Sequence, residues 1–272
     1  MAELEKPKIC GTCGARDAPL KCPCKSIFYC NTACQRADWA MHRKVCVFDL
    51  ERKLERARSR LGNEDREIGE ACADLGLLYQ KQDRHAEAEE MYLEALRIFG
   101  VVEGEGSVLV ASLMESLSRV YKEQGRVDDS LRMKKRVVRV IRRVYGREHH
   151  EVAIAIHDLA CLLVMKGQLE EAVDKFEEAH AMLVSLHVED HQLVGKLLGN
   201  LSYVLELQGK SEQVLAVAQK SHEVTLRAHG CDSDDTVSSL LSLGNAYRDQ
   251  GMPEEALARL EEGLEIVRRI HP

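Results

Sequence analysis

From residue 61 to residue 270 the sequence repeats its chemistry every 42 residues, in five blocks with no insertion or deletion between them. One column of the repeat is leucine throughout: Leu75, Leu117, Leu159, Leu201 and Leu243. A second column holds residues suited to tight turns: Asp83, Gly125, Gly167, Gly209 and Gly251. Because a fixed period of this length is typical of stacked supersecondary units, the pattern predicts a solenoid.

Within a block, apolar residues recur at helical spacing on both sides of the turn column, as in GLLYQKQDRHAEAEEMYLEAL. Each unit is therefore predicted to be a helix, a short turn and a second helix. Small residues at Gly76, Ala88 and Ala95 should let the two helices approach closely, with Tyr79 and Tyr92 filling the space between them.

Two blocks depart from this pattern. Lys134 and Ala218 stand where other blocks carry a large apolar residue such as Tyr92. These two units are expected to pack less well than the others.

The repeat pattern resembles tetratricopeptide repeats, and its length and phrases such as GNLSYVLELQGK and LGNAYRDQGMPEEAL are similar to the kinesin-light-chain class. The resemblance implies an all-α protein with a right-handed α-α solenoid, in which the first helices line a concave groove. The predicted repeats are 61–102, 103–144, 145–186, 187–228 and 229–270.

Cysteines divide the chain in two, because seven of the ten precede position 50. Those seven and His42 provide eight soft ligands, enough for two tetrahedral zinc sites. The start of the chain, MAELEKPK, has no apolar segment typical of a secretory signal. A reducing compartment is therefore expected, where clustered cysteines more often bind metal than form disulfides. A disulfide or redox cluster is the alternative.

Residues 10–46 resemble a MYND-type zinc finger, most closely in FYCNTACQRADWAMHRKVC. The resemblance implies two interleaved zinc sites. One would be held by Cys10, Cys13, Cys30 and Cys34, and the other by Cys22, Cys24, His42 and Cys46. The sequence has one residue between Cys22 and Cys24 where the family usually has two. A short chain segment with few large apolar residues needs such metals to fold.

MYND relatives bind short proline-containing peptides through the Gln and Trp of a CQ-x-x-DW segment. These residues correspond to Gln35 and Trp39. The alternative for Trp39 is a core position over the second zinc.

The segment 47–60 links the finger to the repeats. Its apolar residues alternate by three and four, which predicts one amphipathic helix. Shifted by one period, it takes the place of the second helix of a missing repeat, so it is expected to pack against the first repeat and cap the array.

Several polar and cationic residues fall at positions of the first helices that would face the groove. They are Arg119, Lys122, His157, Asn200, Tyr203, Asn245 and Arg248. Such donors could bind an extended peptide that carries carboxylates. The alternative is that they are solvated helix positions.

Composition narrows the function classes. The net charge of −7 argues against a general nucleic-acid binder, and no apolar run approaches the roughly 18 residues that a membrane span requires. Zinc sites closed by four protein ligands leave no open position for catalysis. We therefore expect a non-enzymatic adaptor, intracellular in the cytoplasm or nucleus, that binds other proteins through extended peptide segments and takes no small-molecule substrate.

Two alternatives stay open at this point. The chain could be an accessory regulator of a methyltransferase or transcription complex, because MYND fingers often accompany such activities. It could also be a nucleic-acid-binding zinc-finger protein.

Overall fold

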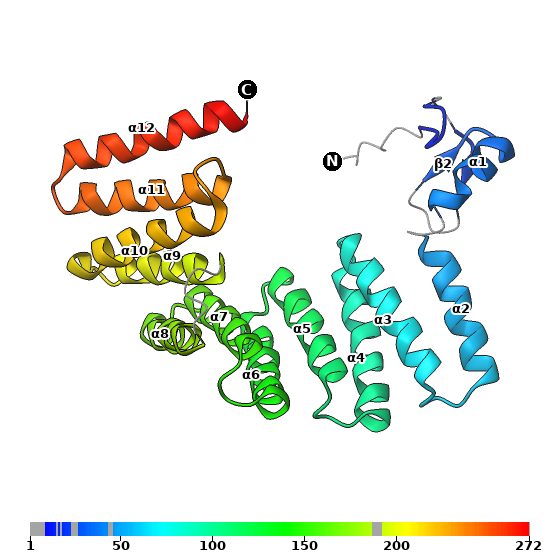
Figure 1. Ribbon diagram of the computed structural model, residues 1–272. Coiled ribbons are helices and arrows are strands. Elements are labelled where there is room, and N and C mark those ends of the chain that lie inside the picture. The colour runs from blue at the N-terminus through cyan, green and yellow to red at the C-terminus, as the bar shows by residue number, and fades with distance from the viewer. Residues whose placement is uncertain are drawn as a thin grey trace, which may run out of the picture. The chain divides into compact units, whose positions relative to one another are not determined.

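The computed structural model describes residues 9–14, 16, 18–22, 27–42, 46–186 and 192–271, without the side chains of 39 and 40 (Figure 1). The chain forms two compact units, Met1–Glu105 and Gly106–Pro272. Each unit is considered by itself below. In the described part of the chain, no helix combines the length and the apolar character that crossing a membrane requires.

The first unit begins with a small finger and continues as helices. In the finger, a two-stranded antiparallel sheet pairs Leu20 with Tyr29 and Lys21 with Phe28. The elements in chain order are β1 (Leu20–Lys21), β2 (Phe28–Tyr29), α1 (Thr32–His42), α2 (Val47–Arg60), α3 (Arg66–Lys81) and α4 (His85–Val102).

The second unit contains only helices in its described residues, arranged as successive antiparallel pairs (Figure 1). The pairs are α5 (Val108–Glu123) with α6 (Val127–Tyr145), α7 (His150–Met165) with α8 (Leu169–Ser185), α9 (Gln192–Leu207) with α10 (Ser211–His229), and α11 (Asp234–Asp249) with α12 (Pro253–Ile270). The starts of α3, α5, α7, α9 and α11 are 42 residues apart, and each of these helices is 16 residues long.

The same local chemistry begins most of the first helices. A side chain just before the helix accepts a hydrogen bond from a backbone N–H of the first turn, which satisfies a donor that the helix itself leaves unpaired. These N-cap residues are Asp65, Ser107, His149 and Ser233. His149, which belongs to a histidine-rich stretch, therefore has a structural role at the start of α7.

The turn between the two helices of a pair needs a left-handed residue. Gly125, Gly167, Gly209 and Gly251 have φ between 69° and 78° there. In the first unit the position is occupied by Asp83, with φ of 58°. Glycine adopts this conformation without steric cost, whereas a residue with a Cβ is strained in it.

The two helices of a pair touch where small residues face each other. A Cβ atom on Gly76 would lie 2.8 Å from the Tyr92 ring. At the equivalent position of the next pair, Ser118 donates a hydrogen bond to the Ser130 carbonyl at 3.1 Å, and Ser130 donates one back to the Ser118 carbonyl at 2.7 Å. Only small side chains fit at this crossing.

The expectation that Lys134 weakens the packing of its unit is wrong. Its side chain is only 4% exposed, and its ammonium donates to Glu115 on α5 and, at 3.1 Å, to Asp158 on α7. Lysine can stand at a core position here because its stem fills the space of an apolar side chain while two carboxylates balance its charge.

Helix α2 packs against α3, and its buried residues are Val47, Leu54 and Ala57. Arg58 on α2 pairs with Glu94 on α4, 36 residues later. The same separation of 36 residues joins Lys135 of α6 to Glu171 of α8. The ion pair between α2 and α4 thus has the same sequence separation as one between the second helices of successive pairs. That residues 47–60 take the place of the second helix of a missing repeat stays a prediction.

Replacing Asp83 by glycine should stabilise the protein. The left-handed conformation costs a residue with a Cβ about 1–2 kcal/mol, and the extra freedom of glycine in the unfolded chain offsets roughly 0.5–1 kcal/mol of the gain. We expect Asp83→Gly to raise the free energy of unfolding by about 0.5–1 kcal/mol in urea denaturation. Gly125→Asp should lower it, and a destabilised Asp83→Gly would contradict the account of this turn.

Replacing Lys134 by alanine should destabilise the protein by about 2–3 kcal/mol, because the change leaves a cavity and removes the cation that pairs with Glu115 and Asp158. Those carboxylates are partly exposed and can rehydrate, which keeps the loss below that of a fully buried pair. Lys134→Met should cost less, since it retains the stem volume. The matched control is the neighbouring Lys135→Ala, which removes a half-exposed ion pair and should change stability by less than about 1 kcal/mol. Equal losses at both lysines would contradict the burial argument.

Candidate metal centre and groove

The turn that carries Cys10 and Cys13 lies against the second strand of the finger. The Gly11 N–H donates to the Phe28 carbonyl at 3.0 Å, and the Gly14 N–H donates to the Cys10 carbonyl at 2.9 Å. A Cβ atom on Gly11 would lie 2.2 Å from the Ile27 side chain. The glycine between these two cysteines therefore leaves room for the Ile27 side chain, which directly precedes the strand.

Cys30 lies just before helix α1, and the helix presents Cys34 to this turn. The Asn31 side chain accepts a hydrogen bond from the Cys34 N–H at 2.8 Å and caps the helix. Thr12 donates to the Cys34 carbonyl at 2.8 Å and fastens the turn to the helix. The chain enters the helix at Thr32 in such a way that the Cys30 and Cys34 sulfurs lie 3.5 Å apart.

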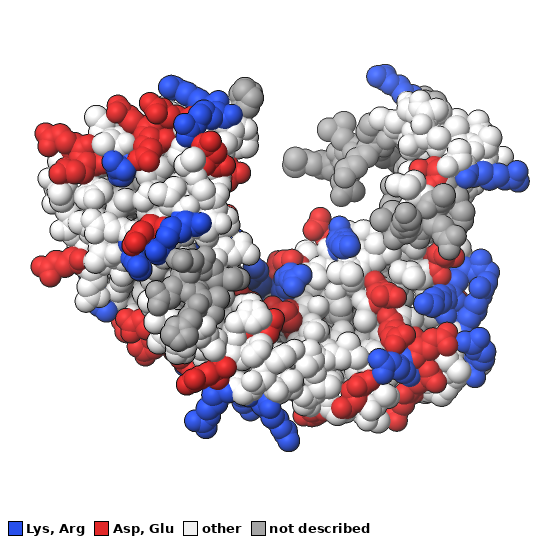
Figure 2. Space-filling view, in the orientation of Figure 1, with Lys and Arg blue, Asp and Glu red and all other residues white. Residues whose placement is uncertain are grey.

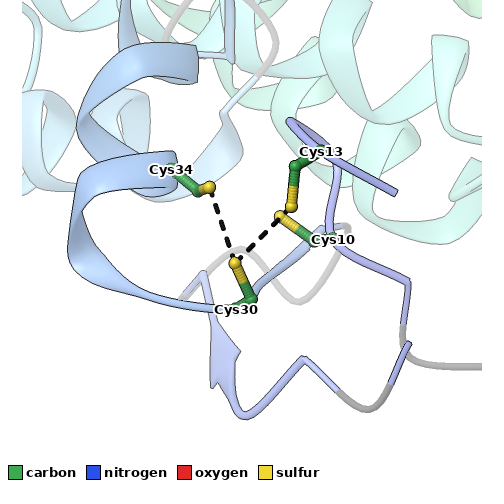
Figure 3. Close-up of side chains that lie close together, drawn as sticks. All are labelled: Cys10, Cys13, Cys30 and Cys34. Carbon is green, nitrogen blue, oxygen red and sulfur yellow. Dashed lines mark hydrogen bonds between the residues drawn. The ribbon is translucent and has the colours of Figure 1, made fainter. Parts of the chain in front are cut away.

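The thiols of Cys10, Cys13, Cys30 and Cys34 converge, and all four sulfurs lie within 4.8 Å of one another (Figure 3). The Cys30 sulfur is 3.6 Å from that of Cys13 and 3.5 Å from that of Cys34. Tetrahedral zinc with Zn–S bonds of about 2.3 Å would hold sulfurs about 3.8 Å apart, whereas a disulfide requires about 2.05 Å. The spacing fits a metal.

Backbone hydrogen bonds prepare one of these thiols for ionisation. The hydrogen bond from the Cys13 backbone is the largest influence on Cys10 and lowers the pKa of its thiol to about 6. Since the thiolate is the form that binds metal, the backbone of this turn favours metal binding.

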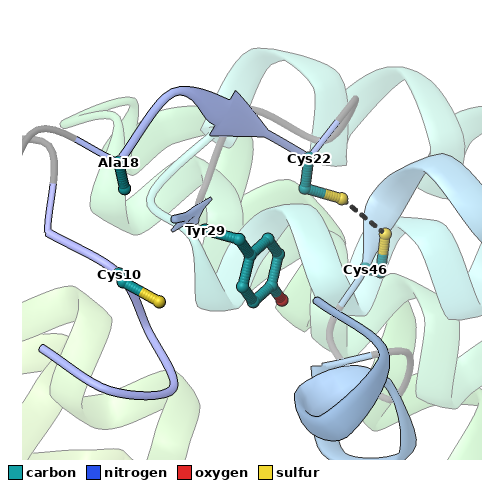
Figure 4. Packing of buried hydrophobic residues seen from close by; sticks show 5 residues of the cluster. All are labelled: Cys10, Ala18, Cys22, Tyr29 and Cys46. Carbon is teal, nitrogen blue, oxygen red and sulfur yellow. Dashed lines mark hydrogen bonds between the residues drawn. The ribbon is translucent and has the colours of Figure 1, made fainter. Parts of the chain in front are cut away.

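A second group consists of Cys22, His42 and Cys46, all buried, with ligand atoms within 4.8 Å of one another. The Cys22 sulfur lies 3.8 Å from that of Cys46 (Figure 4) and 3.1 Å from His42 Nε2. Two sulfurs and an imidazole at these distances are also a zinc-type donor set. Cys24 lies outside the described residues.

Tyr29 is a residue of the finger that sequence reasoning missed. Its side chain is fully buried in the cluster that includes Cys10, Cys22 and Cys46 (Figure 4). Its hydroxyl donates to Asp38 at 2.7 Å, and its ring meets that of His42 edge-on with centroids 6.3 Å apart. Tyr29 therefore fixes strand β2 to helix α1 and orients the histidine. The sequence feature that could have indicated this role is the aromatic pair Phe28–Tyr29, just before Cys30.

The two residues predicted to contact a peptide from the finger both belong to α1. Gln35 is half-buried there. The side chain of Trp39 is outside the described part of the structure, so its predicted role stays a prediction.

In the second unit, cavities open over the first helices. One, of about 360 Å³, is lined by Arg119 and Lys122 together with Glu115 and Asp158. Another, of about 440 Å³, is lined by residues that include His157, Asn200 and Tyr203. The structure thus brings five of the predicted groove residues to two cavities. Asn245 and Arg248 do not line a described cavity, and Arg248 donates to Asn245 at 3.2 Å.

A network of charged groups on α7 joins these cavities to the buried lysine. His157 Nδ1 lies 3.2 Å from Asp158, and Asn200 Nδ2 lies 3.0 Å from His157 Nε2. Burial lowers the pKa of His157, but its hydrogen bonds with Asp158 and Cys161 outweigh burial and raise it to about 9. Burial likewise raises the pKa of Asp158, and the hydrogen bond with His157 and the charge of Lys134 bring it below its usual value.

Charges on the outer surface are mixed. On the face shown in Figure 2, Lys and Arg side chains are interspersed with Asp and Glu over α2–α4 and over α11–α12. Pairs such as Arg97 with Glu64 and Arg269 with Asp232 account for part of this mixture. Over these helices, the face shown therefore does not present the single-sign charge that binds a nucleic-acid backbone.

Comparisons with known proteins match both parts of the chain. The tetratricopeptide repeat model matches residues 69–140, 109–183 and 187–269, and the MYND finger model matches residues 10–46. A search of curated proteins finds N-lysine methyltransferase SMYD2-A of Xenopus laevis, 44% identical over 48 residues. That match covers 17% of this chain and 11% of the relative, so the chain spans about a tenth of the methyltransferase.

Among solved structures, BtubC (BKLC) from P. vanneervenii has a TM-score of 0.68 at 21% identity, covering 86% of this chain and 94% of that one. A putative kinesin light chain of Podospora anserina with nearly identical TPR-like repeats has a TM-score of 0.64 at 20% identity, covering 74% and 94%. The Rap conjugation gene regulator of plasmid pLS20, in complex with the Phr* peptide, has a TM-score of 0.54 at 17% identity, covering 75% and 55%. At these identities the likeness concerns the fold.

The repeat model covers well over half of the sequence, and the finger model spans the two groups of metal-binding cysteines. The chain therefore belongs to the tetratricopeptide repeat proteins, with the repeats following a MYND zinc finger.

Proposed function

We propose that this protein is a non-enzymatic adaptor whose finger and groove each bind a peptide segment of a partner protein. The observation that carries the proposal is the polar groove of the second unit, where Arg119, His157, Asn200 and Tyr203 line cavities over the first helices. Side-chain donors held on rigid helices suit the recognition of an extended backbone and its side chains. The peptide held by the Rap regulator, a protein of similar fold, supports this mode of binding.

We further propose that the finger holds two zinc ions per chain. Cys10, Cys13, Cys30 and Cys34 would hold one, and Cys22, Cys24, His42 and Cys46 the other; the sulfur spacings support the first set and three members of the second. Zinc would supply structural cross-links to a module with few apolar residues. Because a reducing compartment keeps clustered cysteines free to bind metal, the proposed location of the adaptor is the cytoplasm or the nucleus.

A second candidate is an accessory regulator of a methyltransferase or transcription complex. The match to a lysine methyltransferase favours it, but that match is confined to 48 residues. A methyl-transfer assay on the purified chain separates the candidates, because transfer without any added partner would overturn the adaptor proposal.

Native mass spectrometry should find two zinc ions on the wild-type chain. Cys30→Ser and Cys22→Ser should each lose one ion, because each removes a ligand from a different group, and Cys72→Ser on α3 should keep both. Chelation should unfold the finger while the helix pairs retain their far-ultraviolet circular dichroism, since metal binding supplies on the order of 10 kcal/mol to such modules. A single ion on the wild-type protein would contradict the two-site proposal.

Peptide display against the full chain should recover two sequence classes, one for each module. Cys30→Ser should abolish binding of the finger class only, and Arg119→Ala with Asn200→Ala should weaken the groove class about tenfold or more, because two side-chain donors are lost. Arg132→Ala, on the paired surface of α6, serves as control. Recovery of no peptide class by a folded, zinc-loaded chain would refute the proposal.

A further inference from the structure

The cavity of about 440 Å³ in the second unit is formed by residues of α7, α9, α10 and α11. On α9 it is lined by Gly195 and Gly199. The equivalents of Gly199 in other pairs are larger: Ala73, Glu115, His157 and Leu241. A missing side chain at this one position of the repeat therefore helps to hollow the cavity.

One hydroxyl of the cavity lining has no hydrogen-bond partner among the described residues. Thr225 on α10 is 6% exposed, and it forms no hydrogen bond with any residue that the structure describes. Its Oγ1 faces Gly195, where a Cβ atom would lie only 2.5 Å away. A lining hydroxyl that makes no hydrogen bond within the described part of the protein can donate one to a ligand acceptor in the cavity.

The serine hydroxyls around it are already used. Ser221 donates to the Gly195 carbonyl at 2.9 Å, and Ser239 donates to the Thr236 carbonyl at 2.8 Å. Ser238 and Ser242 donate to carbonyls of their own helix. Thr225 therefore differs from its neighbours, which satisfy their donors within the protein.

Lys196 adds an uncompensated positive charge to the same cavity. It is exposed on α9 and makes no ion pair with another described residue. Two histidines of the lining lie beside carboxylates. His229 Nδ1 is 3.5 Å from Asp235, and His157 Nδ1 is 3.2 Å from Asp158.

We infer that this cavity, defined by Lys196, Gly199 and Thr225, binds the carboxylate side chain of an Asp or Glu in a partner peptide. The inference rests on the proposed peptide-binding function of the groove and assigns one subsite of it. The ammonium of Lys196 supplies the opposite charge, and the Thr225 hydroxyl supplies a donor that a carboxylate oxygen can accept. Tyr203, exposed at the same cavity, offers a ring and a hydroxyl to the adjoining peptide.

The test uses four decapeptide pools on beads that are random except at the fifth position, fixed as Glu, Gln, Lys or phosphoserine. Purified full-length chain is passed over each pool and the retained protein is quantified. The wild type should be retained by the Glu pool about tenfold more than by the Gln or Lys pool. Equal retention by Glu and Gln would overturn the inference, as would a clear preference for phosphoserine over Glu.

Three variants test whether the preference for the Glu pool arises at this cavity. Lys196→Gln removes the charge, Thr225→Val removes the hydroxyl at constant shape, and Gly199→Leu fills the cavity with the residue found at the equivalent Leu241. Each should abolish most of the Glu preference, while Lys220→Gln, which removes a lysine paired with Glu223, should retain it. If Thr225→Val and Lys196→Gln keep the full preference with native circular dichroism, the subsite is wrong. Retention by no pool, with folded wild type, would refute the peptide-binding function itself.

Discussion

The close crossing of the two helices in each pair is the contact on which the helical part of this protein depends. It lies between positions 12 residues apart, one on each helix. Ser118 and Ser202 donate there to the carbonyls of Ser130 and Val214, and at Gly244 a Cβ atom would lie 3.4 Å from the Ala256 carbonyl. Backbones at this distance exclude large side chains, so small residues are a steric requirement at these positions of the repeat. The larger residues of the repeat then pack around the crossing.

The finger is organised by a different constraint. It has few large apolar residues, and its buried cluster consists chiefly of cysteines with Ala18 and Tyr29. Side chains that would bind metal thus occupy the place of a core. Tyr29 joins strand to helix at its centre. Cys46 immediately precedes α2, so the last predicted ligand of the finger is also the N-cap residue of the helix that packs on α3.

Much of this architecture follows from residue pattern alone. Period and turn residues predict the helix pairs, because helical spacing and positive-φ positions are local properties. Ligand spacing likewise predicts that Cys30 and Cys34 face one metal group, since four residues make about one helical turn.

The sequence pattern does not predict the features that depend on contacts between residues distant in sequence. The sequence pattern predicts a packing defect at Lys134, because it does not show that Glu115 and Asp158 lie beside this residue in the fold. Lys196 and Thr225 have ordinary neighbours in the sequence, and only the packing of α9 against α10 places them in one cavity. The boundaries of the five sequence blocks and the ligand role of Cys24 stay predictions.

The position of Lys134 has a consequence for how the array loses its structure. Its two carboxylate partners belong to different helix pairs, Glu115 to the same pair as the lysine and Asp158 to the next. Fraying of the next pair would leave the buried ammonium with half of its compensation, which penalises partly unfolded states in which only one pair is intact. The α5–α6 and α7–α8 pairs should therefore melt as one cooperative block and exchange their amide hydrogens together.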